Sequence, residues 1–65
     1  MTAIEKIDEL RRNKNMTAKE LSIKSGISEV TMSNWKRGKT IPRLSALGKV
    51  AKALEIDISI LRPYF

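Results

Sequence analysis

The 65-residue chain contains no cysteine and no histidine. The lack of cysteine excludes disulfide bonds, thiolate catalysis and sulfur-ligated zinc sites, and the lack of histidine removes the usual general base and metal ligand. The one enzyme alternative rests on Glu5, Asp8 and Glu9, but carboxylates a turn apart on an amphipathic helix are usually a solvated face. We therefore expect no enzymatic activity, no metal and no cofactor.

Long apolar runs are also missing. Residues 2–10 alternate apolar with charged side chains, which is not the pattern of a signal peptide, and no stretch is long enough to span a bilayer. Apolar residues still make up 42% of the chain, enough for one thin core near the lower size limit for independent folding. We expect one domain over residues 1–65, in the cytoplasm and without membrane contacts.

Acidic residues are scarce in the middle of the chain. The net charge is +6, and residues 11–43 carry nine of the 13 lysines and arginines but only two of the seven acidic residues. A concentrated basic block is the electrostatic footprint of a protein that binds a polyanion, since phosphate contacts supply most non-specific nucleic-acid affinity. Charge alone does not exclude the alternative of a solvated surface.

Capping signals divide the chain into helices. The Thr-x-x-Glu spacing of a capping box occurs at Thr2 to Glu5 and at Thr17 to Glu20. These boxes predict helices over about 3–13 and 18–25, the second ended by Gly26.

The later elements follow from similar signals, and strand signals are weak throughout. They are a helix over about 29–37 with Ser28 as N-cap, a helix over about 43–54 opened by Pro42 and interrupted by Gly48, and a fifth helix over about 58–62, capped by Asp57 and stopped by Pro63. The sequence thus predicts an all-α, compact five-helix bundle.

The second and third predicted helices are separated only by Gly26, Ile27 and Ser28. Two short helices joined by a three-residue turn with glycine are typical of a helix-turn-helix, in which the second helix projects outward. Met32 and Trp35 are its core positions. The face left for solvent or a major groove contains Glu29, Val30, Ser33, Asn34 and Arg37.

A set of short motifs then resembles one family along nearly the whole chain. The motifs are Thr17-x-x-Glu20-Leu21-Ser22, Ser25-Gly26-Ile27-Ser28, Met32-Ser33-Asn34-Trp35, Arg37-Gly38-Lys39, Pro42 and Ala51-Lys52-Ala53-Leu54. Together they resemble the phage repressor and Cro type (XRE-like) of helix-turn-helix transcriptional regulator. The resemblance implies a lambda-repressor-like domain of prokaryotic or phage origin. Such a domain represses transcription by binding a pseudo-palindromic operator in double-stranded DNA as a homodimer.

The resemblance also implies roles for individual residues. The base-reading positions correspond to Glu29, Val30 and Asn34, and the backbone-contacting positions to Thr17, Lys39 and Arg43, with Thr31 a weaker match. Asn34 can pair with adenine, Glu29 can accept from the amino group of cytosine, and Val30 can touch a thymine methyl. An acid in the first turn of a helix is stabilising without DNA, so both interpretations of Glu29 stay open.

Two departures from the family concern phosphate contacts. Ala18 stands where glutamine is usual, and we expect Lys19 to replace that contact in part. Lys36 stands where the family often has a glutamate paired with a first-helix arginine, here Arg11, so that ion pair cannot form. The two cations either serve DNA phosphates or are solvated, and Lys36 is counted among the backbone-contacting candidates.

The C-terminal segment is more apolar than a small domain needs. Ile58, Ile60, Tyr64 and Phe65 are candidates for a self-complementary dimer interface, which we favour over simple completion of the core. The main alternative function is a protein-interaction module, such as an antirepressor or antitoxin-like regulator, with the same fold. The basic block argues against a purely protein target, and a regulatory protein partner beside DNA is left open.

Overall fold

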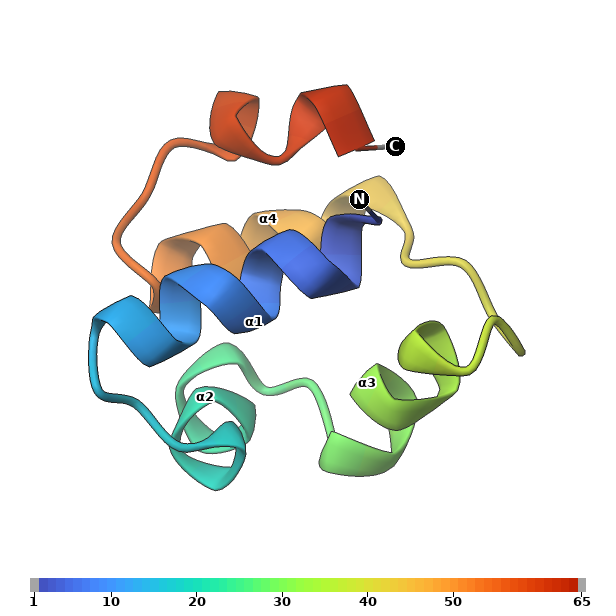
Figure 1. Cartoon of the computed structure of the whole chain (residues 1–65), viewed down its shortest axis with the longest axis horizontal. Helices are drawn as coiled ribbons and strands as arrows, with labels where there is room; N and C mark the ends of the chain where they lie inside the picture. Colours follow the sequence, from blue (N-terminus) through green and yellow to red (C-terminus); the bar gives the residue numbers. More distant parts are fainter. Residues whose placement is uncertain (1, 65) are drawn as a thin grey trace.

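The computed structural model describes residues 2–64, and the elements of that part of the chain are all helical (Figure 1). They are α1 (Ala3–Asn13), α2 (Ala18–Ser25), α3 (Glu29–Lys36), α4 (Leu44–Ala53) and the 3-10 turns η1 (Ile58–Ile60) and η2 (Arg62–Tyr64). The expected all-α class is confirmed. No helix of the described residues is long and apolar enough to cross a membrane.

Both capping boxes form as the sequence predicts. The hydroxyl of Thr17 accepts a hydrogen bond from the amide of Glu20 at 3.1 Å, and the Glu20 carboxylate accepts one from the amide of Thr17 at 3.1 Å. Thr2 and Glu5 make the same pair of bonds at the start of α1. The bond from the threonine amide lowers the pKa of each glutamate, because it stabilises the ionised carboxylate. The first turns of α1 and α2 are thereby fixed.

Three helices end in the same hydrogen-bond pattern. After α1, α3 and α4, one residue takes a positive φ, and its amide and the amide of the next residue bond back to the last turn. The positive-φ residues are Asn15, Gly38 and Glu55. Glycine is the residue that indicates a positive φ in a sequence. Gly38 therefore predicts the end of α3, whereas the ends of α1 and α4 at Asn15 and Glu55 have no glycine to predict them.

The core lies where α4 packs against α2 and η1 and where α1 packs against α3. Its fully buried side chains are Ile7, Leu21, Leu47, Val50, Leu54 and Leu61. Met32 and Trp35 add the inner face of α3, with 8% and 7% of their surface exposed. In Figure 1, α2 and α3 lie together on one side of α1, opposite the C-terminal turns. The core therefore holds α3 through one face and leaves its other face to solvent.

The C-terminal segment differs from the expected fifth α-helix. It consists of two 3-10 turns, closed by bonds such as Leu61 N to Ile58 O at 2.9 Å, because three-residue segments are too short for α-helical bonds. Asp57 caps the first turn through the amide of Ser59, as expected. Pro63 lies inside the second turn rather than ending a helix, since the bond from the Tyr64 amide to Leu61 O does not need the amide that proline lacks.

The start of α4 also differs slightly from expectation. Pro42 precedes the N-cap residue Arg43, so the helix begins at Leu44 and the proline lies outside it. Proline still suits this place, because its ring favours an extended approach to the cap and its missing amide is not needed there.

Gly48 offers a test of the packing between α4 and η1. A Cβ built on Gly48 would lie 3.8 Å from Cδ1 of Ile58, which is ordinary van der Waals contact. We expect Gly48→Ala to raise the free energy of unfolding by about 0.8–1 kcal/mol, because alanine is the better helix former. Denaturant titration measures this. A loss of stability would mean that η1 packs more tightly on α4 than the structure shows.

Candidate nucleic-acid interface

The turn between α2 and α3 sets the direction of α3. Gly26 closes α2 with a φ of 75°, and its amide bonds to Ser22 O at 2.9 Å. Two residues later, the hydroxyl of Ser28 accepts a hydrogen bond from the amide of Thr31 at 3.1 Å, which starts α3. The helices pack against each other across this turn and form the helix-turn-helix arrangement seen in Figure 1.

The three base-reading candidates lie on α3, away from Met32 and Trp35. Glu29 and Val30 are exposed at the start of the helix, with 69% of Val30 accessible to solvent. Asn34 lies one turn later and is partly exposed. The structure therefore presents all three side chains where a partner can reach them.

One set of backbone-contacting candidates lies at the start of α2. Thr17 is the N-cap residue and Lys19 lies in the first turn, and both are exposed. The capping box fixes the Thr17 hydroxyl, because its oxygen already accepts the Glu20 amide. Ala18, the residue between them, has only a methyl side chain and therefore supplies no polar side-chain contact.

A second set lies along α3 and the loop that leads to α4. Thr31, Lys39 and Arg43 all line one open groove of about 640 Å³, together with Thr40 and Ser45. Arg43 is the N-cap residue of α4 but makes no side-chain cap bond, so its own side chain leaves the first amides of α4 uncapped. Cationic side chains, hydroxyls and uncapped amides are groups that bind phosphate. We refer to this groove as the anchor groove.

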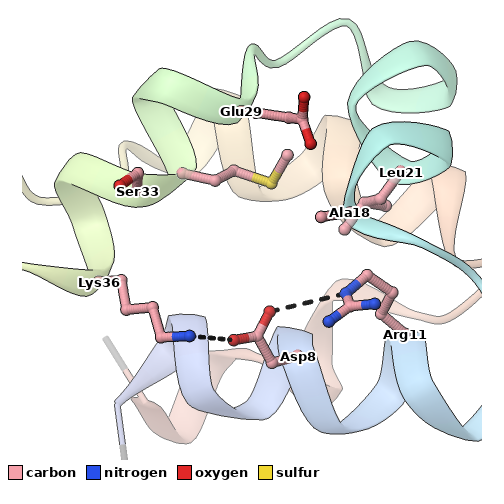
Figure 2. A pocket seen from close by; sticks show the side chains of 8 residues that line it. Asp8, Arg11, Ala18, Leu21, Glu29, Ser33 and Lys36 are labelled. Atoms are coloured by element: carbon pink, nitrogen blue, oxygen red, sulfur yellow. Dashed lines mark ion pairs between the residues drawn. The ribbon is translucent and has the colours of Figure 1, made fainter.

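Lys36 lies apart from both sets. Its ammonium is 3.5 Å from Oδ2 of Asp8, and Nε of Arg11 is 3.7 Å from Oδ1 of the same carboxylate, as Figure 2 shows. The glutamate–arginine ion pair expected at these two positions in the family is absent here. Both positions are cationic instead, and they share the Asp8 carboxylate as their anion. Sequence reasoning missed Asp8 because it assigned the acidic residues of α1 to a solvated face.

A family comparison agrees with this geometry. The family model of the Cro/C1-type HTH DNA-binding domain matches residues 6–60, from within α1 to the end of η1. The chain belongs to this family. Neither the curated proteins nor the solved structures provide a match.

The C-terminal residues of this Cro/C1-type domain divide between core and surface. Ile58 and Tyr64 are partly buried against the core, and 41% of Ile60 is exposed. Phe65, the fourth residue predicted for a dimer interface, lies outside the described residues. Ile60 is therefore the described residue of this set that offers most apolar surface to a partner.

Proposed function

We propose that this Cro/C1-type domain is a transcriptional repressor that binds a pseudo-palindromic operator as a homodimer, with α3 in the major groove. The observation that carries the proposal is the exposed face of α3, with two sets of cationic and hydroxyl side chains nearby. This face bears Glu29, Val30 and Asn34. The expected prokaryotic or phage origin places its action in the cytoplasm.

Each side chain on this face suits a different base. The amide of Asn34 donates to and accepts from adenine, the Glu29 carboxylate accepts from the amino group of cytosine, and the Val30 methyls contact the thymine methyl. Glu29 also lies in the first turn of α3, where its charge favours the helix in the absence of DNA. We assign it both roles.

The phosphate contacts flank the reading face. At the start of α2, DNA backbone phosphates are bound by Thr17 and Lys19. In the anchor groove, other backbone phosphates are bound by Thr31, Lys39 and Arg43. Such contacts fix the register of α3 on the duplex and carry no sequence information themselves.

The dimer is supported by the exposed apolar surface at Ile60 and by the small size of the domain. A twofold axis near η1 would place two copies of α3 about 34 Å apart, on half-sites about one duplex turn apart. Sedimentation tests this arrangement. A monomer mass at all concentrations, both with and without DNA, would contradict it.

A salt titration separates the proposal from a pure protein-interaction module. Binding to random-sequence duplex should show log affinity falling by about 0.9 per neutralised phosphate for each decade of salt. Lys19, Lys39 and Arg43 therefore predict a slope of about 2.7 per bound copy. A protein-interaction module predicts little affinity at any salt concentration.

A pair of matched variants makes the titration specific to the anchor groove. Replacing Lys39 and Arg43 with glutamine should lower the slope by about 1.8 per copy. Replacing Lys49 and Lys52 with glutamine removes the same charge from a different groove on α4 and should leave the slope nearly unchanged. Equal effects of the two double variants would show that only net charge matters.

A further inference from the structure

Asp8 links two cations that belong to different helices. Its carboxylate lies 3.5 Å from the Lys36 ammonium on α3 and 3.7 Å from Arg11 Nε on α1. Only 21% of the Asp8 side chain is exposed, whereas the Lys36 side chain is 64% exposed. The more buried partner is therefore the anion, and the lysine reaches back to it across the gap between α1 and α3, as in Figure 2.

Arg11 extends this link toward α2. Its Nη1 donates a hydrogen bond of 2.6 Å to the carbonyl oxygen of Met16, the residue before the N-cap Thr17. Arg11 Nε is buried and has no hydrogen-bond partner among the described residues, so its nearest compensating charge is the Asp8 carboxylate. One carboxylate thus connects α3, α1 and the approach to α2.

The space beside this link explains why the charges matter. A cavity of about 280 Å³ is lined by residues of all three helices, among them Ala18, Glu29 and Ser33. Figure 2 shows the short Ala18 side chain facing this space, with Lys36 and Asp8 at its other edge. The ion pair of Lys36 with Asp8 at the edge of this open pocket is a contact between α1 and α3 in addition to the buried packing of Met32.

We propose that Asp8 is a positioning residue for the DNA-reading helix, acting through Lys36 and Arg11. The inference rests on the proposed function and deepens it. In this arrangement Lys36 serves to hold α3 against α1, in place of the phosphate contact expected for it. Asp8 itself touches no DNA.

The sign of the effect separates positioning from simple electrostatics. Asp8→Asn removes a negative charge from a protein whose net charge is +6, so electrostatics alone predicts tighter binding to every duplex. Positioning predicts weaker binding to the preferred sequence, because α3 loses the restraint that aligns its side chains with the bases. The two explanations therefore differ in direction.

The experiment compares affinity for the duplex selected by the native protein with affinity for random-sequence duplex. For Asp8→Asn we expect the ratio of the two affinities to fall about three- to tenfold, which is the size of two partly exposed ion pairs. Asp8→Glu, which keeps the charge, should recover part of the loss. Glu9→Gln is the matched control, because Glu9 pairs with Lys6 at 3.0 Å on the same helix. A uniform rise in both affinities for Asp8→Asn would overturn the proposal.

Lys36→Met provides a second variant with an exposed side chain, so folding is preserved. We expect it to lower the ratio of the two affinities, as Asp8→Asn does, and we expect the double variant to have the same ratio as Asp8→Asn alone. If Lys36 instead binds a phosphate, Lys36→Met lowers the affinity for both duplexes by the same factor. It then also lowers the slope of log affinity against log salt concentration by about 0.9. That result would refute the positioning role.

Amide NMR spectra of the free protein test the link without DNA. Asp8→Asn should shift the resonances around Lys36 and those of Met16 and Thr17, whereas Glu9→Gln should not. Changes confined to neighbours within α1 would contradict the proposal. If the native protein prefers no DNA sequence, the proposed function fails, and these spectra still decide whether Asp8 holds α3.

Discussion

Replacing Trp35 with alanine is expected to lower the free energy of unfolding by about 3–5 kcal/mol, because a large buried aromatic leaves a cavity when it is truncated. Trp35 is 7% exposed and lies between the anchor groove and a second groove of about 300 Å³ on its other side. A domain of this size has a total stability of roughly 3–10 kcal/mol. The variant should therefore be largely unfolded or close to it.

Denaturant unfolding followed by circular dichroism measures this effect, since the variant lacks the one tryptophan of the chain. Trp35→Phe should lose less, because most of the volume is retained. Ile41→Ala is the control in the neighbouring loop: Ile41 is 87% exposed, and the change should stay within about 0.5 kcal/mol. A loss below about 1 kcal/mol for Trp35→Ala would mean that α3 is not held by this side chain.

Asn34→Ala is expected to weaken binding to the preferred duplex by about 5- to 150-fold, the equivalent of about 1–3 kcal/mol for a lost bidentate base contact. Affinity for random-sequence duplex should stay nearly the same, because Asn34 carries no charge and lies outside both sets of phosphate contacts. Equilibrium titration of both duplexes at one salt concentration gives the two numbers.

A second asparagine provides the control for that measurement. Asn13→Ala makes the same chemical change at the exposed end of α1, away from α3, and should leave both affinities unchanged. If Asn34→Ala lowers the affinity for the preferred duplex and for the random duplex by the same factor, Asn34 does not read a base.

Much of the fold could be predicted because its signals are local. The capping boxes at Thr2 and Thr17 and the glycines after α2 and α3 each determine a helix end through bonds within a few residues. The family motifs depend on these same positions, so fold class and family followed together from the sequence.

Other features depend on tertiary geometry or lack a sequence signal. Glu55 adopts a φ of 57° where glycine would be the usual choice, and the C-terminal segment forms two 3-10 turns where the sequence predicted a fifth α-helix. The role of Asp8 could not be predicted, because Lys36 is 28 positions away and reaches it only when α3 lies against α1. The sequence shows that a lysine replaces the family's usual glutamate at position 36, but it does not show that Asp8 is the partner of this lysine.

The most direct test of the central claim is selection of duplexes from a random library by the native protein, Asn34→Ala and Glu29→Ala in parallel. We expect the native protein to enrich a pseudo-palindrome whose half-sites are centred about 10–10.5 base pairs apart. Each variant should lose preference at one base position of every half-site. No enrichment by the native protein, or one and the same preference for all three proteins, would contradict base reading by α3.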